Sequence, residues 1–143
     1  METKTAHIFL VEDNLADVLL IKEALRRRKI AYEIDHYPTA PEAIRALSDR
    51  GEGTSVPDLV LLDQNVPGGQ GLDVLAAVAQ NPHMDGVPRA LLSSFLLPEE
   101  RERAKQLGAA TFISKPSDLN SFLSEVGAMV ENLLEKTHEP RPL

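Results

Sequence analysis

Short apolar runs alternate five times along the chain with stretches whose apolar residues recur every three or four positions. Apolar runs of this kind fill strands buried on both faces of a parallel sheet, and the periodic stretches are typical of amphipathic helices. The expected strands cover residues 7–11, 32–37, 59–62, 90–93 and 111–114. The second of these alternates in side-chain character, which indicates a half-buried or edge strand.

The expected helices follow the strands in turn and cover residues 14–29, 39–49, 72–80, 98–107 and 119–136. Thr39 and Glu42 have the spacing of a capping box, and Pro98 stands at a helix start. Strands and helices that alternate with short connections form right-handed crossovers onto a parallel sheet. We therefore predict a doubly wound α/β fold, with one domain over residues 1–136 and a disordered tail over residues 137–143.

Composition narrows the classes of function. The formal net charge of −7 argues against nucleic-acid binding, which depends on Lys and Arg side chains at the phosphates. The basic run at residues 26–29 falls where the first helix should end, and cations there complement the helix dipole. The chain has no Cys and no apolar stretch approaching the roughly 20 residues that span a bilayer. We expect a cytoplasmic protein without disulfides, thiolate metal sites or membrane contact.

Polar side chains gather at the ends of the expected strands, where ligands bind in sheets of this kind. They are Glu12 and Asp13 after the first strand, Asp63 after the third, Ser93 ending the fourth and Lys115 after the fifth. Taken singly, each has an ordinary explanation, such as an acid at a helix N-terminus or a solvated loop lysine. Because parallel strands bring these ends to one edge, we expect the five side chains to share one site.

Three carboxylates at one site repel each other unless a cation lies among them. Oxygen ligands favour Mg²⁺, whereas zinc is disfavoured because neither Cys nor His stands at these strand ends. With such an ion, Asp63 can act as a nucleophile toward phosphorus. Lys115 and the Ser93 hydroxyl can then each stabilise one phosphoryl oxygen.

At these residues the sequence resembles the receiver domains of bacterial two-component response regulators, from Ile8 to about Leu134. The segments that carry the resemblance are Val11–Asn14, Leu61–Pro67, Ser93–Ser94 and Lys115–Pro116. The resemblance implies a flavodoxin-like (βα)5 fold with strand order 2-1-3-4-5. It also implies a partner histidine kinase, or a phosphotransfer protein, as phosphoryl donor, and a protein that catalyses only its own phosphorylation and dephosphorylation.

By the same resemblance, Asp63 is the phosphoacceptor, and Glu12 and Asp13 bind the metal together with Asp63 and the main-chain carbonyl of Asn65. The resemblance also implies that Ser93 and Phe112 report phosphorylation to the surface formed by the fourth helix, fifth strand and fifth helix. A tyrosine often occupies the position of Phe112 in this family. An aromatic switch in this chain must therefore work by packing alone.

Two finer expectations concern partners. The stretch Ala16–Ile21 is similar to regulators paired with bacterial phytochromes, which implies a bacteriophytochrome as the cognate kinase. The last helix carries a long apolar stripe, at Leu119, Phe122, Val126, Met129 and Leu133. Part of this stripe can face a second copy in a homodimer, or the core can use all of it.

Two other functions fit parts of the pattern. A haloacid-dehalogenase-type phosphatase also uses a strand-end aspartate with magnesium, but it needs a carboxylate two residues later, where this chain has Asn65. A pseudo-receiver would be a protein-binding module whose acidic site takes no phosphate. The chemically competent residues at all five strand-end positions count against it.

Overall fold

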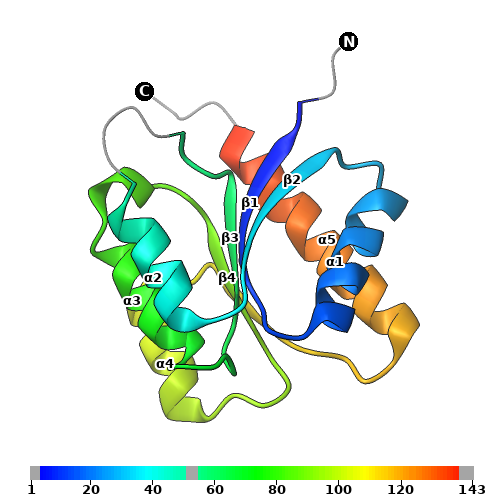
Figure 1. Cartoon of the computed structure of the whole chain (residues 1–143). Coiled ribbons are helices and arrows are strands. Elements are labelled where there is room, and N and C mark those ends of the chain that lie inside the picture. The colour runs from blue at the N-terminus through cyan, green and yellow to red at the C-terminus, as the bar shows by residue number, and fades with distance from the viewer. Residues whose placement is uncertain (1–3, 51–54, 139–143) are drawn as a thin grey trace.

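A five-stranded parallel sheet in the order β2-β1-β3-β4-β5 lies between two layers of helices (Figure 1). The computed structural model describes residues 4–50 and 55–138. The strands are β1 (Ala6–Val11), β2 (Tyr32–Tyr37), β3 (Leu59–Asp63), β4 (Arg89–Ser93) and β5 (Thr111–Ser114). The helices are α1 (Leu15–Arg27), α2 (Ala40–Ser48), α3 (Gly71–Ala79), α4 (Pro98–Gln106) and α5 (Leu119–His138), with a 3-10 turn η1 (Pro82–Met84). The predicted α/β fold and strand order are confirmed.

The core is divided into two clusters, one on each face of the sheet. Successive residues of a strand point to opposite faces, so Ile8 and Leu10 join the cluster under α1 and α5. Phe9 and Val11 join the cluster under α2, α3 and α4. All four side chains are buried, and full burial of an apolar side chain stabilises a fold by about 1.5–3 kcal/mol. The continuous apolar run of β1 therefore follows from a strand covered on both sides.

Most helix ends lie within one residue of the sequence-based boundaries, and two differ by two residues. α1 ends at Arg27, two residues before its expected end, because Lys29 has a φ of 59° in the left-handed region. α5 continues to His138, so residues 137 and 138 of the expected tail belong to the helix. The rest of that tail, residues 139–143, lies outside the described residues.

The apolar stripe of α5 packs against α1 and the sheet. Phe122, Val126, Met129 and Leu133 are all buried within the single chain, and of the stripe only Leu119 is exposed. Four of the five stripe residues therefore belong to the core, which was the alternative to their facing a second copy in a homodimer.

The strand register brings the carboxyl ends of the strands to one edge of the sheet. Val11 pairs with Leu62, Asp63 pairs with Leu92, and Ser93 pairs with Ser114. The residues that follow β1, β3, β4 and β5 are therefore neighbours, as the site prediction requires.

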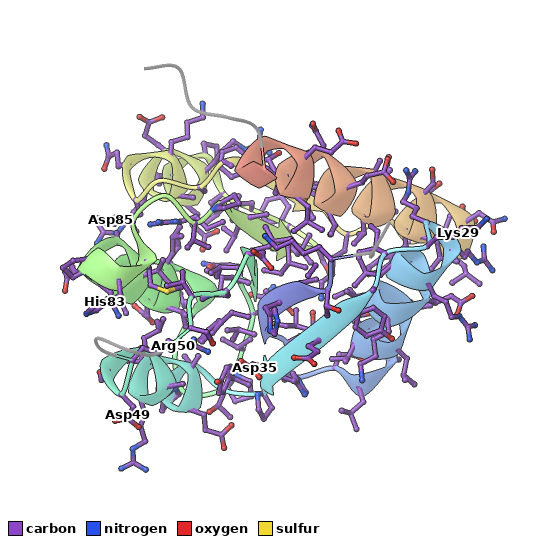
Figure 2. All side chains as sticks on the ribbon, turned by 90° about the horizontal axis from the view of Figure 1, so that it is seen from above. Lys29, Asp35, Asp49, Arg50, His83 and Asp85 are labelled. Carbon is purple, nitrogen blue, oxygen red and sulfur yellow. The ribbon has the colours of Figure 1, made fainter. Side chains whose placement is uncertain are left out.

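Arg50, which follows α2 at the opposite end of the sheet, connects that helix to β2. Figure 2 looks onto this end and labels Arg50 beside Asp35 of β2. The Arg50 guanidinium donates to Asp35 at 3.1 Å and to the Ser55 carbonyl at 2.8 Å, and lies 5.5 Å from the ring centroid of Phe9. These contacts connect α2 to the β2 edge, and none of them involves a predicted site residue.

Within residues 4–50 and 55–138, no helix has the length and apolar character needed to cross a membrane.

Candidate functional site

Tight packing at the end of β3 fixes the backbone of the site. Asp63 is the last residue of β3, and α3 begins at Gly71 directly against it. A Cβ added at Gly71 would lie 2.4 Å from the Asp63 carbonyl oxygen, closer than any side chain tolerates. The start of α3 can therefore approach the end of β3 only because residue 71 is glycine.

Three carboxylates meet at this edge, as predicted. Oxygens of Glu12, Asp13 and Asp63 lie within 4.8 Å of one another. Glu12 and Asp63 are buried, at 0% and 5% exposed, while Asp13 is exposed. Like charges this close destabilise the fold unless a cation or a proton offsets them.

Lys115 supplies a cation to this cluster. Its Nζ donates to Glu12 Oε2 at 2.8 Å, to Asp63 Oδ2 at 2.9 Å and to Asp17 Oδ2 at 2.8 Å. Burial opposes the charge on the ammonium, but the hydrogen bonds to these three carboxylates outweigh it and raise the pKa of Lys115. The predicted grouping of Glu12, Asp13, Asp63 and Lys115 is therefore present in the structure.

Asp17 was missed from sequence. It lies in the first turn of α1, where an acid is already expected to complement the helix dipole. Its contact with Lys115 depends on how α1 leaves the end of β1. No spacing along the chain could have distinguished it from other acids in first turns.

The single positive charge of Lys115 does not offset all of the negative charge of the cluster, and Glu12 therefore holds a proton more tightly than an ordinary carboxyl group. Burial, a hydrogen bond with Asp63 and the charge of Asp63 raise the pKa of Glu12 to about 8, although Lys115 acts in the opposite direction. Glu12 is also held in place from both ends. Its Oε1 accepts from the Asn14 amide at 3.2 Å, and its carbonyl lies 2.6 Å from His36 Nε2. Glu12 is thus a carboxyl group fixed in position that favours its protonated form while no metal ion is bound.

The oxygen atoms of the site fit a hard divalent cation. Two buried carboxylates and one exposed carboxylate converge, and no Cys or His joins the group in the described part of the chain. Such a donor set suits Mg²⁺, which keeps part of its water shell, and it does not suit zinc. The backbone amide of Asn65 donates a hydrogen bond to Asp63 Oδ1 at 3.0 Å, so the backbone of Asn65 lies beside the acids. Metal binding by the Asn65 carbonyl stays a prediction.

Ser93 lies at the adjacent strand end, but its hydroxyl faces the next loop. The Oγ donates to the Phe95 carbonyl at 2.6 Å and accepts from the Phe95 amide at 3.2 Å. Ser93 is buried, so this exchange of hydrogen bonds fixes the start of the segment between β4 and α4. A role at phosphorus requires the hydroxyl to leave the Phe95 carbonyl.

Phe112 is half-buried on β5, and its ring has no hydroxyl group, so it can only make packing contacts. The Arg101 guanidinium from α4 lies 5.6 Å from the ring centroid. Ser93, Arg101 and Phe112 all line one small cavity of about 80 Å³. The two residues predicted to form the switch therefore adjoin the same space, and their function as a switch stays a prediction.

Comparison with known proteins agrees with this geometry. A family model described as the response regulator receiver domain matches residues 8–127. Response regulator Rcp1 of Synechocystis sp. is 29% identical over 135 residues, which cover 93% of this chain and 92% of that protein. The structure of the phosphorylated cyanobacterial phytochrome response regulator RcpA has a TM-score of 0.84 at 32% identity, covering 96% of this chain and all of that one. The Mn²⁺-bound form of Rcp1 has a TM-score of 0.81 at 28% identity, covering 96% and 99%.

Proposed function

Because this chain belongs to the response regulator receiver family, we propose that Asp63 accepts a phosphoryl group from a sensor histidine kinase. The chain then acts as a two-component signalling protein that relays its phosphorylated state by binding another protein. The observation that carries this proposal is the contact of the Lys115 ammonium with both Asp63 and Glu12, with Asp13 beside them. A nucleophile, a fixed cation and a divalent-cation site are thereby combined at one sheet edge.

We propose Mg²⁺ as the resident cation, held by Glu12, Asp13, Asp63 and the Asn65 carbonyl. The all-oxygen donor set supports this choice, and the Mn²⁺-bound form of the relative Rcp1 shows a divalent cation in a similar protein. When bound, the ion supplies positive charge to the carboxylate and to the phosphoryl oxygens.

The chain's own residues then have separate tasks in the transfer. A carboxylate oxygen of Asp63 forms the new bond to phosphorus while the bond from phosphorus to the donor nitrogen breaks, and the nitrogen keeps the electron pair. The Lys115 ammonium, already 2.9 Å from Asp63, offsets charge on a phosphoryl oxygen. The Ser93 hydroxyl donates to another phosphoryl oxygen after it leaves the Phe95 carbonyl.

The finer identity of the partners is part of the proposal. The 32% identity to a regulator described as a phytochrome response regulator supports a bacteriophytochrome as the kinase, acting with this chain in the cytoplasm. The proposed homodimer uses a surface other than the four buried residues of the α5 stripe, Phe122, Val126, Met129 and Leu133.

The test is phosphorylation by a small donor. We expect incubation with Mg²⁺ and either acetyl phosphate or a phosphoramidate to add the mass of one phosphoryl group, which alkali removes. Asp63→Asn should abolish the gain, and Asp49→Asn, which changes an exposed aspartate in the same way, should not. An unchanged wild-type mass would instead support a pseudo-receiver, and repeated turnover of phosphate esters would support a phosphatase.

A further inference from the structure

The side chain of Gln64 connects three elements immediately beside the proposed phosphoacceptor. It is only 2% exposed. Its Oε1 accepts from the Leu72 amide in the first turn of α3 at 3.0 Å, and its Nε2 donates to Gln70 at 3.4 Å and to Glu100 of α4 at 2.7 Å. A buried amide with both ends bonded is held in one orientation.

The main chain of Gln64 is equally constrained. Its amide donates to the Leu92 carbonyl of β4 at 2.9 Å, and its carbonyl accepts from the Gly71 amide at 3.0 Å. Gln64 therefore cannot rotate away without breaking bonds to β4 and α3.

Glu100 divides its two carboxylate oxygens between Gln64 and the start of α4. Oε2 accepts from Gln64, while Oε1 accepts from the Leu97 amide at 2.9 Å. Leu97 is the residue that caps α4, and it follows the Ser93–Phe95 hydrogen bonds along the chain. The position of the first turn of α4 is thus set partly by Gln64.

We propose that the Gln64–Glu100 hydrogen bond transmits changes at Asp63 to the first turn of α4. This inference rests on the proposed phosphorylation of Asp63. Gln64 is a positioning residue in this scheme, because it acts through Glu100 and does not touch the phosphoryl group. The route is separate from that of Ser93, which reaches the same region from β4 through Phe95.

The neighbouring backbone gives the physical reason for transmission. Asp63 Oδ1 accepts from the Asn65 amide, so the two residues that flank Gln64 are bonded to each other. A phosphoryl group on Asp63 changes the charge and the bonds of that carboxylate, and the peptide units on both sides of Gln64 must adjust. Because Gln64 is bonded at every polar group, its displacement is passed to Glu100 rather than absorbed by a rotation.

Glu100→Gln breaks this bond selectively. The new side chain has only one acceptor oxygen, so it cannot bond both the Leu97 amide and the Gln64 NH₂ group. The oxygen is expected to stay on the Leu97 amide, because the Gln64 NH₂ group can bond Gln70 instead and two NH₂ groups cannot bond each other. Gln64 cannot turn over to compensate, since its oxygen is needed by the Leu72 amide. Glu99→Gln is the matched control, because Glu99 is an exposed acid in the same first turn.

Residue-resolved amide exchange by NMR tests the restraint without phosphate. The Arg101 amide makes the first intrahelical bond of α4, to the Leu97 carbonyl at 2.9 Å. In the unphosphorylated protein we expect Glu100→Gln to speed its exchange on the order of tenfold, since a hydrogen bond to a charged group is lost. Glu99→Gln should change it less than about twofold, the scale of a lost charge–dipole contact. Equal exchange in both variants overturns the restraint.

The second measurement tests transmission, with Mg²⁺ and beryllofluoride as a stable substitute for the phosphoryl group. We expect the resulting chemical-shift change at the Arg101 amide to fall below half of the wild-type value in Glu100→Gln and to be retained in Glu99→Gln. A full response in Glu100→Gln overturns transmission through Gln64. A wild-type chain that gains no phosphoryl mass overturns the proposed function instead, and transmission with it, while the exchange experiment still decides the restraint.

Discussion

At the scale of single residues, Lys115 holds together a site whose net charge is negative. Its ammonium contacts three carboxylates and no second lysine or arginine of the described chain shares these bonds. The fold therefore depends on this cation whenever no metal ion is bound.

Lys115→Ala should destabilise the metal-free protein by about 3 kcal/mol, because it leaves buried carboxylates without a partner. The measurement is urea unfolding in EDTA and again in excess Mg²⁺, where the loss should shrink since a divalent cation takes over the neutralisation. Lys105→Ala, at an exposed lysine of α4, is the control and should change stability by less than about 0.5 kcal/mol. An equal loss with and without Mg²⁺ would contradict this role.

The residues that sequence could identify share one property. Glu12, Asp13, Asp63 and Lys115 directly end or follow apolar strands, so chain order and the parallel-sheet rule together predict that they meet. Asp17 and Gln64 could not be predicted in this way. The first lies on a helix and the second is buried between elements, and their partners are set by packing across the sheet edge.

At the scale of elements, the close approach of α3 to β3 determines the geometry around Asp63. Gly71 carries this contact, since its missing side chain leaves room for the Asp63 carbonyl. The helix then places its first amides beside Gln64.

Gly71→Ala should lower the free energy of unfolding by about 1–3 kcal/mol through overpacking against backbone atoms. Gly127→Ala, in α5, is the matched control, because the added Cβ is crowded only by the flexible Arg28 side chain, which can move, and lies at an ordinary contact distance of 3.4 Å from the Ala24 carbonyl oxygen. Alanine also favours a helix interior over glycine by roughly 1 kcal/mol. Urea denaturation of the two variants should thus give opposite or clearly unequal changes, and equal changes would refute the packing argument.

Helix and strand identities followed from periodicity, whereas their ends did not. The Thr39 hydroxyl accepts from the Glu42 amide at 3.2 Å, so the capping signal located the start of α2 correctly. The end of α1 depends on a left-handed backbone at Lys29, a residue type that gives no warning of it. Boundaries of this kind are decided by how the chain must turn to enter the next strand.

At the scale of the whole molecule, the acidic site makes stability depend on pH in a direction unusual for a carboxyl group. In the metal-free fold the pKa of Glu12 is about 8, well above its ordinary value of 4.5. Between these values the folded chain holds a proton that the unfolded chain has released. The contribution of Glu12 is therefore complete below about pH 4.5 and is lost as the pH rises through about 8.

We expect the free energy of unfolding in EDTA to fall from pH 6 to pH 8, with a slope that approaches about 1.4 kcal/mol per pH unit at most for one proton. Lys115 adds no slope here, because its raised pKa matters only above its ordinary value of 10.5. Urea unfolding of Glu12→Gln provides the comparison and should lack this part of the slope. The same slope in both proteins would exclude Glu12 as its source.

Because all five strands run in one direction, the acidic site and the two ends of the described fold lie at opposite ends of the sheet. Figure 1 shows that β1 begins and α5 ends at one end of the molecule, and the acids lie at the other, after the carboxyl ends of β1 and β3. We therefore expect that a fluorescent protein or an affinity tag fused next to β1 or α5 leaves the site around Asp63 open to an incoming kinase.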